Sequence, residues 1–147
     1  MNIRRLITAL SFLCSIQLAD AHCQIPCGIY GDQLKLDELK QHVETITKAS
    51  AQIRAIAAKE SLEAEDHQQL ARWVSNKESH ASKMIDEAAN YFLAQRIKPG
   101  QDNYQAKLES LHHIILYAMK SKQSSGAEAP EILAEKLATF QALYLKD

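Results

Sequence analysis

The sequence predicts an all-α protein that folds as an up-down-up-down four-helix bundle. Apolar residues recur at steps of three and four over four long segments, which is the period of an amphipathic helix. Short polar breaks separate these segments, so consecutive helices must double back on one another. Alternating runs of β-branched residues, which would indicate strands, do not occur, and the chain of 147 residues has only four glycines.

The first two helices are predicted between residue 32 and residue 98. Asp32 is expected to be the N-cap of the first, because aspartate is favoured at that position. The second runs from about residue 67 to residue 98, where Pro99-Gly100 ends it. The residues expected to face the core are Leu36, Leu39, Val43, Ile46, Ile53, Ala57, Leu70, Trp73, Val74, Ala81, Met84, Ile85, Ala88, Tyr91 and Phe92.

The third and fourth helices complete the predicted bundle. Asp102 is the expected N-cap of the third helix, which ends before the polar break at residues 124–126. Pro130 lies at the start of the fourth, where the first helical turn does not need the N–H that proline lacks. The residues expected to face the core are Tyr104, Leu108, Leu111, Ile115, Ala118, Leu133, Leu137, Phe140 and Tyr144.

Residues 1–21 have the three parts of a secretory signal peptide. Arg4 and Arg5 form a positive start, an apolar run follows, and Ala19 and Ala21 supply the small residues that a signal peptidase requires. A membrane anchor or a buried first helix is the alternative, although the apolar run is short for a membrane span. We expect cleavage after Ala21, export to the periplasm or the extracellular space, and one mature domain of residues 22–147.

The charge balance of the chain argues against some classes of partner. Lys and Arg number 17 and Asp and Glu number 18, so the formal net charge is −1 at pH 7. A nucleic-acid-binding domain would need a basic excess gathered on one face. No segment after the signal peptide has the apolar length of a transmembrane helix. We therefore expect the mature protein to bind neither nucleic acid nor membrane.

The most informative segment is residues 22–30, His-Cys-Gln-Ile-Pro-Cys-Gly-Ile-Tyr, which we call the hook. Cleavage after Ala21 would make His22 the amino terminus and bring together an amine, an imidazole and the thiolates of Cys23 and Cys27. With the amide nitrogen of Cys23, these groups offer planar nitrogen and sulfur ligation, which suits nickel(II) or copper(II) better than zinc. Pro26 bends the chain so that Cys27 can return to the same metal. The alternative is a Cys23–Cys27 disulfide, since secreted chains commonly pair their cysteines.

The hook resembles that of nickel-containing superoxide dismutases at every fixed position of the motif His-Cys-x-x-Pro-Cys-Gly-x-Tyr. Members of that family have a short hook followed by a four-helix bundle, and they assemble into hexamers. The resemblance covers residues 22–147, strongly in the hook and more loosely beyond it. It implies a nickel cofactor with one ion per subunit, superoxide anion as the substrate, and a homohexamer.

The resemblance also implies roles for individual residues. Nickel would be held by the amine and axial imidazole of His22, the amide nitrogen and thiolate of Cys23, and the thiolate of Cys27. Tyr30 matches the tyrosine that closes the pocket over the open face of the metal. Glu38 falls where family members have a carboxylate that hydrogen-bonds the axial imidazole. An arginine on the second helix assists in some members, and a rough alignment places His80 there instead.

The activity implied by the resemblance is the conversion of superoxide to oxygen and hydrogen peroxide, with nickel cycling between Ni(II) and Ni(III). Lys35 is the cationic residue nearest to the hook after it, and a positive local field would attract the anionic substrate. A solvated lysine at the start of a helix is an equally good interpretation of Lys35. The alternative function is a non-enzymatic extracytoplasmic protein that binds nickel or copper through the same hook.

Overall fold

The computed structural model describes residues 31–145, so the hook and the predicted signal peptide lie outside the described residues. The elements in chain order are α2 (Asp32–Ala57), α3 (Ala64–Asp86), η1 (Glu87–Arg96), α4 (Tyr104–Gln123) and α5 (Glu128–Tyr144). The element η1 is a π-helix that continues α3 without a break. Every element of the described range is helical, and none of these helices is long and apolar enough to cross a bilayer.

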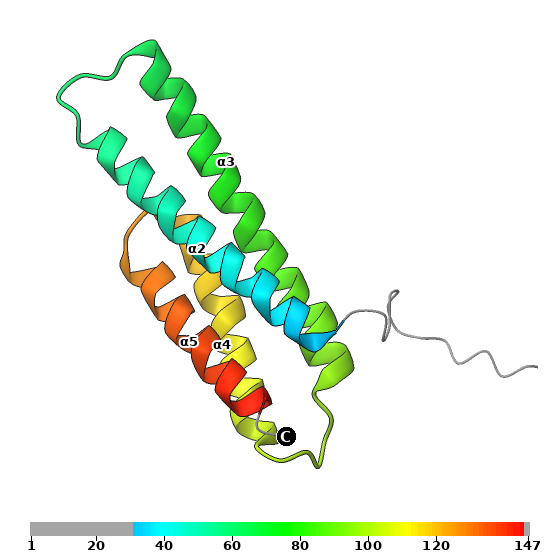
Figure 1. Cartoon of the computed structure of the whole chain (residues 1–147). Coiled ribbons are helices and arrows are strands. Elements are labelled where there is room, and N and C mark those ends of the chain that lie inside the picture. The colour runs from blue at the N-terminus through cyan, green and yellow to red at the C-terminus, as the bar shows by residue number, and fades with distance from the viewer. Residues whose placement is uncertain (1–30, 146–147) are drawn as a thin grey trace, which may run out of the picture.

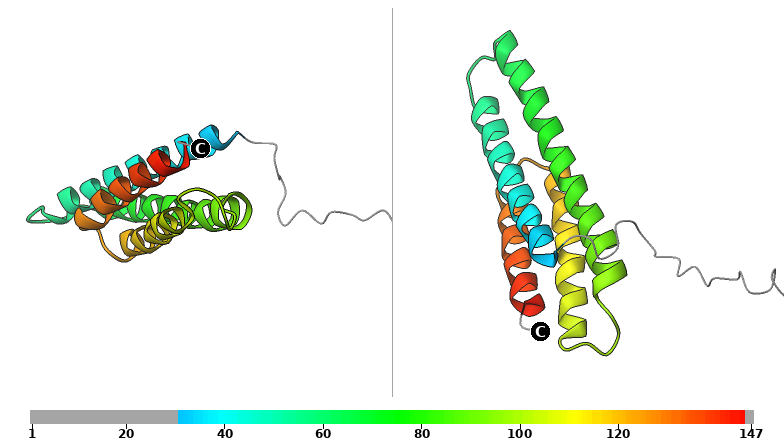
Figure 2. Two further views of the ribbon diagram at one scale, coloured as in Figure 1. Left: turned by 90° about the horizontal axis from the view of Figure 1, so that it is seen from below. Right: turned by 45° about the vertical axis from the view of Figure 1, so that its right-hand side comes forward.

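The helices form an up-down-up-down bundle, as the sequence predicts (Figure 1). α2 packs antiparallel to α3 and α4 antiparallel to α5, while α3 also contacts α4 and α2 contacts α5. The α2–α3 pair extends beyond the α4–α5 pair at the end that carries the α2–α3 loop (Figure 2). At the opposite end, the start of α2 lies beside η1 and the end of α5.

One apolar stripe from each helix forms the core. Phe92 is fully buried in this core, with its ring edge-on to Phe140 and Tyr144 at centroid distances of 5.1 and 5.4 Å. Such edge-to-face pairs stabilise a core beyond the area that they bury. The buried cluster consists of Leu36, Leu39, Val43, Ile46, Ala81, Met84, Ala88, Tyr91, Phe92, Ile97, Leu111, Ile114, Ala118, Leu133, Leu137 and Phe140.

Some residues predicted to face the core are exposed. Val74 is 41% exposed and Ala57 is exposed as well, while Leu70 and Trp73 are only partly buried. Ala57 ends α2 and the other three lie in the first half of α3, and at this end the α2–α3 pair extends past the shorter α4 and α5 (Figure 2). The amphipathic pattern marks a helix face here, but it does not report how far the partner helices reach.

Two predicted N-caps are wrong. Gly31 is the N-cap of α2, and Asp32 is the first residue inside the helix. Asn103 rather than Asp102 is the N-cap of α4, and its φ of 55° is in the left-handed region that asparagine tolerates better than most residues. Pro130 lies in the first turn of α5, as predicted.

The second helix begins earlier than predicted and ends close to the predicted place. It starts at Ala64, because the Asp66 carboxylate accepts a hydrogen bond from the Glu63 N–H and so completes the first turn. Its π-helical continuation ends at Arg96, shortly before the Pro99-Gly100 break. Gly100 has a φ of 88°, which lets the chain turn there toward α4.

Candidate functional site

The predicted site residues divide into two groups. His22, Cys23, Cys27 and Tyr30 lie outside the described residues, and Glu38 lies in α2. The structure therefore shows the part of the bundle that directly follows the hook. Two side-chain clusters gather there, one around Glu38 and one around Asp32.

Glu38 belongs to a cluster that joins α2 to η1. Lys35 donates hydrogen bonds from Nζ to Glu38 Oε2 at 2.6 Å and to Glu87 Oε1 at 2.5 Å. The side chains of Lys35 and Glu87 are 15% and 17% exposed, whereas that of Glu38 is 37% exposed. Lys35 is therefore a largely buried partner of two carboxylates, and the interpretation as a solvated lysine is wrong. Glu38 keeps a face open to further partners.

The pKa values of the two carboxylates are shifted in opposite directions. The hydrogen bond from Lys35 lowers the pKa of Glu38 and outweighs the opposing effect of burial. Burial raises the pKa of Glu87, against the hydrogen bond from Lys35, and the neighbouring Glu38 carboxylate raises it further. Glu87 Oε2 is also buried without a hydrogen-bond partner among the described residues. Glu38 is thus ionised over a wider pH range than Glu87, which gains a proton more readily as the pH falls.

A pair of histidines lies next to this cluster. The Nδ1 atoms of His42 and His80 are 3.0 Å apart, and the two rings are edge-on at a centroid distance of 4.8 Å. Burial lowers the pKa of both histidines, and the nearby Lys83 lowers both further. A hydrogen bond between two ring nitrogens requires one proton between them, so one ring must accept. His80 of α3 thus contacts His42, which lies one helical turn after Glu38 in α2.

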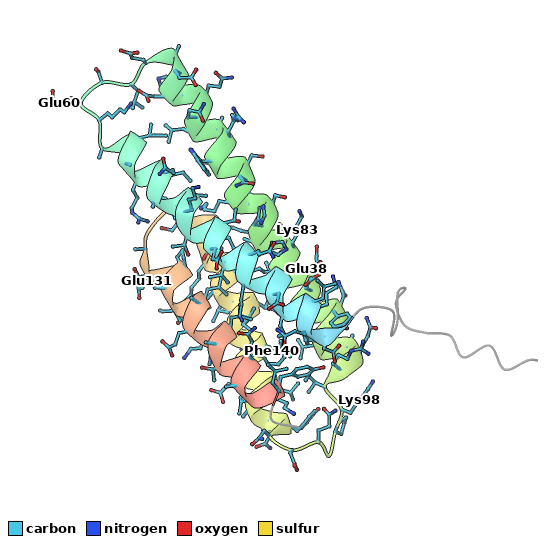
Figure 3. All side chains as sticks on the ribbon, in the orientation of Figure 1. Glu38, Glu60, Lys83, Lys98, Glu131 and Phe140 are labelled. Atoms are coloured by element: carbon cyan, nitrogen blue, oxygen red, sulfur yellow. The ribbon has the colours of Figure 1, made fainter. Side chains whose placement is uncertain are left out.

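A cavity of about 500 Å³ opens between α2 and α3 beside these groups. Figure 3 shows Glu38 and Lys83 at the same level of the bundle, on the two helices that flank it. Polar and charged residues line it, namely Glu38, Gln41, His42, Lys83, Asp86 and Glu87. This lining suits water and small ions better than an apolar ligand.

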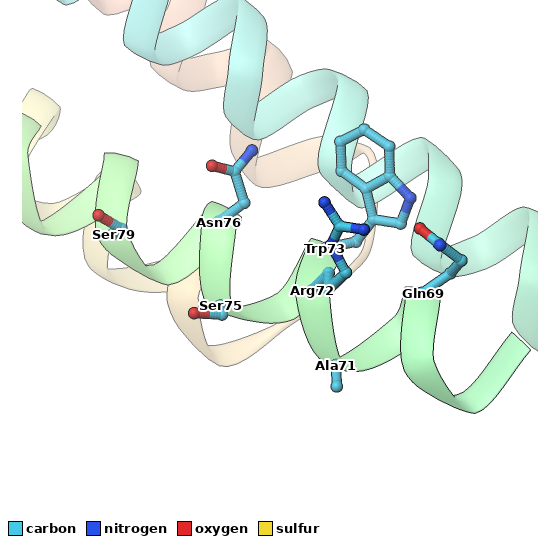
Figure 4. Close-up of a pocket in the computed structure, with 7 residues that line it drawn as sticks. All are labelled: Gln69, Ala71, Arg72, Trp73, Ser75, Asn76 and Ser79. Atoms are coloured by element: carbon cyan, nitrogen blue, oxygen red, sulfur yellow. The ribbon is translucent and has the colours of Figure 1, made fainter. Parts of the chain in front are cut away.

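A larger hollow of about 750 Å³ lies along the middle of α3 (Figure 4). Its described lining residues are Gln69, Ala71, Arg72, Trp73, Ser75, Asn76 and Ser79, of which Arg72 alone is charged. The carboxylates and histidines are absent from this lining. The groups suited to proton transfer or to metal support therefore gather at the Glu38 end.

The second cluster surrounds Asp32, and we call it the Asp32 cluster (Asp32, Tyr91, Arg96 and Tyr144). Asp32 Oδ1 accepts hydrogen bonds from Tyr91 Oη at 2.5 Å and from Arg96 Nε at 2.8 Å. Asp32 Oδ2 accepts one from Tyr144 Oη at 2.7 Å. Burial alone would raise the pKa of Asp32, but these three hydrogen bonds outweigh it and lower the pKa. Burial also raises the pKa of both tyrosines, which remain neutral donors.

The π-helical turn of η1 creates part of this cluster. Tyr91 and Arg96 are five residues apart, and one π turn places such residues above one another, whereas an α-helix would rotate them about 140° apart. Arg96 Nη2 donates to Tyr91 Oη at 2.8 Å, and the guanidinium lies 4.6 Å from the centroid of the Tyr91 ring. The sequence pattern does not reveal this cluster, because Tyr91 has core spacing and Asp32 resembles a cap.

The described residues also limit where a metal can bind. Within residues 31–145, no group of three or more His, Cys, Asp or Glu side chains is arranged to hold a metal ion. All three cysteines of the chain precede residue 31. Thiolate ligation must therefore come from the N-terminal segment, where His22, Cys23 and Cys27 lie. Their amine, imidazole, amide and thiolate donors fit a metal that prefers planar nitrogen and sulfur ligation.

Comparison with known proteins identifies the family of the chain. The chain matches the family model of nickel-containing superoxide dismutases over residues 17–147, a range that includes both the hook and the bundle. No curated protein and no solved structure matches it. The family match confirms the resemblance found in the sequence, and with it the nickel cofactor and the superoxide substrate. The chain belongs to the nickel-containing superoxide dismutases, a family of oxidoreductases.

Proposed function

We propose that His22, Cys23 and Cys27 hold one nickel ion per subunit and that Glu38 and Tyr30 complete the catalytic site. Bound nickel would supply one-electron chemistry between Ni(II) and Ni(III), which oxidises one superoxide to oxygen and reduces the next to hydrogen peroxide. The observation that carries this proposal is the hook sequence, which ends directly before the helix that bears Glu38. The family match over the same residues supports it.

Glu38 would act as the acceptor that orients the His22 imidazole. Its carboxylate is held by Lys35 at 2.6 Å, has a lowered pKa and keeps a partly exposed face. An ionised carboxylate that accepts the ring N–H of a ligating histidine fixes the ring orientation and raises its basicity. The Lys35 bond removes rotamer freedom from Glu38, so the acceptor is in place before the imidazole arrives. Tyr30 would close the pocket and order water there.

The cavity beside Glu38 suits proton supply. Reduction of superoxide to hydrogen peroxide consumes two protons, and a polar cavity gives water a route to the site. Glu87 lines this cavity and gains a proton more readily than Glu38. The Lys83 side chain in the same lining contributes positive charge, which favours the approach of an anion.

If the chain is exported, the signal peptide would be cleaved first and nickel would bind afterwards. Cleavage after Ala21 frees the His22 amine, so full ligation would follow cleavage, in the periplasm or outside the cell. Assembly as a homohexamer is part of the same proposal and rests on family resemblance.

The test is superoxide disproportionation by protein purified with its native terminus after expression with nickel, together with intact mass, nickel content and electron paramagnetic resonance. We expect a chain that starts at His22, one nickel per subunit, rapid turnover and a rhombic trivalent-nickel signal. A variant that retains one residue ahead of His22 is the control, because it blocks the amine and should lose the signal. Nickel binding without turnover would favour the non-enzymatic alternative. A metal-free chain with a Cys23–Cys27 disulfide, even under reducing conditions with nickel, would overturn the proposal.

A further inference from the structure

The start of α2 is tied to parts of the chain that are far from it in sequence. The Asp32 carboxylate accepts hydrogen bonds from Tyr91, Arg96 and Tyr144, which follow it in the chain by 59, 64 and 112 residues. Tyr91 and Arg96 belong to η1, whereas Tyr144 belongs to α5. The first residue of the helix is therefore held by two other elements at once.

These bonds hold a helix end that has little other support. The N-cap Gly31 has no side chain with which to accept the exposed N–H groups of the first turn. Within the backbone, the Gly31 carbonyl accepts from the N–H groups of Leu34 at 3.0 Å and Lys35 at 3.4 Å. Hydrogen bonds to an ionised carboxylate are stronger than neutral ones, and Asp32 accepts three. The Asp32 cluster thus holds the start of α2 through side chains of η1 and α5, and not through the N–H groups that a cap would satisfy.

We propose that Asp32 is a positioning residue for the metal site, because its hydrogen bonds to η1 and α5 fix the base of the hook on the bundle. The proposal rests on the proposed function. Asp32 follows Tyr30 by only two residues and precedes Glu38 by less than two helical turns. Holding the first turn of α2 in place therefore holds the point at which the hook joins the helix. This point then keeps a constant position relative to Glu38, the carboxylate proposed to support the His22 imidazole. Weakening the cluster should loosen the hold on nickel without removing a ligand.

Two substitutions separate this role from general stabilisation. Asp32→Asn keeps the shape of the side chain but removes the charge, and Tyr144→Phe removes one donor and leaves the other two. Asp66→Asn is the matched control. Asp66 is also an acidic residue in the first turn of a helix and accepts from Lys59 Nζ at 2.6 Å and from the Glu63 N–H at 3.2 Å. Asp66 lies in the first turn of α3, and the start of α3 is at the end of the α2–α3 pair opposite the start of α2, which bears Glu38 (Figure 1).

The main measurement is the rate at which nickel-loaded, full-length mature protein releases nickel to excess chelator. We expect release at least about tenfold faster for Asp32→Asn, the factor expected from one charge-assisted hydrogen bond, and a smaller increase for Tyr144→Phe. The nitrogen hyperfine splitting in the trivalent-nickel spectrum should be less well resolved in both variants. Asp66→Asn should keep the wild-type release rate and spectrum even if its melting temperature falls.

Two results would overturn the proposal. The first is wild-type nickel release from Asp32→Asn, and the second is equally accelerated release from Asp66→Asn, which would make the effect one of general stability. If the wild type binds no nickel, the proposed function fails and the role of Asp32 at the metal fails with it. Amide exchange of Leu34 and Lys35 in the metal-free chain then decides whether Asp32 fixes the first turn: faster exchange in Asp32→Asn supports this, and unchanged exchange rejects it.

Discussion

Lys35 and Glu87, which are 52 residues apart in the chain, form a largely buried ion pair with 2.5 Å between Nζ and Oε1. The same ammonium group binds Glu38, so one cation is shared by two carboxylates on different helices. This arrangement joins α2 to η1 beside the polar cavity. Its contribution to stability should depend on the ionisation of the carboxylates.

Replacing Lys35 with methionine should lower the free energy of unfolding by about 1–3 kcal/mol at pH 7, since it leaves ionised groups close together and without their cation. Glu38 has a lowered pKa, so its bond to Lys35 stabilises the fold above the unfolded pKa of about 4.3 and loses effect as the pH falls. The loss measured by urea denaturation should therefore be smaller near pH 4. Lys136→Met is the control, because its partner Glu135 is 67% exposed. Equal losses at both pH values would contradict this interpretation.

The His42–His80 pair should make stability fall as the solution becomes acidic. Both histidines have lowered pKa values because of burial, so the folded chain favours the neutral rings. The unfolded chain takes up protons once the pH falls to about 6.5, and stability is lost from there down through the folded pKa. His80→Gln should reduce the drop in melting temperature between pH 7 and pH 5. The exposed His67→Gln serves as the control, and an unaltered slope in His80→Gln would reject the prediction.

Phe92→Ala should lower the free energy of unfolding by about 3–5 kcal/mol, because it removes a fully buried ring and leaves a cavity against Phe140 and Tyr144. Thermal and urea unfolding measure the loss. Leu34→Ala, at a residue that is 51% exposed, should change stability by less than about 0.5 kcal/mol. Similar effects of the two substitutions would show that Phe92 is not central to the core.

Lys77→Met should destabilise the end of α4. Lys77 is 4% exposed, and its Nζ donates to the backbone carbonyls of Ser121, Lys122 and Ser124 at 2.6, 3.1 and 2.7 Å. Methionine keeps most of the apolar stem but leaves these carbonyls without their donor, at a cost of about 1–3 kcal/mol. Amide exchange near residues 118–124 should speed up in this variant. An exposed lysine such as Lys48, changed to methionine, should leave that exchange as it is.

The bundle could be predicted from the sequence because each helix carries one continuous apolar stripe. Leu36, Leu39, Val43 and Ile46 follow helical spacing, and all four are at most 6% exposed. Periodicity of this kind reports which face of a helix is buried. It does not report the relative lengths of neighbouring helices, and so the exposure of Val74 could not be foreseen.

The Asp32 cluster could not be predicted, because its members come together only in the folded chain. An aspartate before an apolar stripe satisfies the rule for an N-cap, and nothing local indicates partners as distant as Tyr144. Lys35 shows the same limit. The sequence left a substrate-attracting cation and a solvated lysine as equal possibilities, and the outcome depends on Glu87 in another element.

The proposed metal ligands, unlike the Asp32 cluster, could be predicted from the sequence, because they are close to one another in the chain. His22, Cys23 and Cys27 are close in the chain, so their convergence on one metal needs no long-range folding information. Their ligand roles stay predictions, as do Tyr30, the signal peptide and the hexamer. Glu38 is the predicted site residue that the structure describes, and it lies in a charged, partly exposed cluster.

The π-helical turn makes this end of the molecule depend on the number of residues more than on their identity. Phe92, Leu93, Ala94 and Gln95 lie between Tyr91 and Arg96. Inserting one residue among Leu93, Ala94 and Gln95 would place Tyr91 and Arg96 six residues apart, a spacing that neither an α-helical turn nor a π turn brings to one face. Arg96 would then point away from Asp32 although every chemical group of the cluster was still encoded. A shift in length here would break an attachment that most substitutions among the same three residues should leave intact.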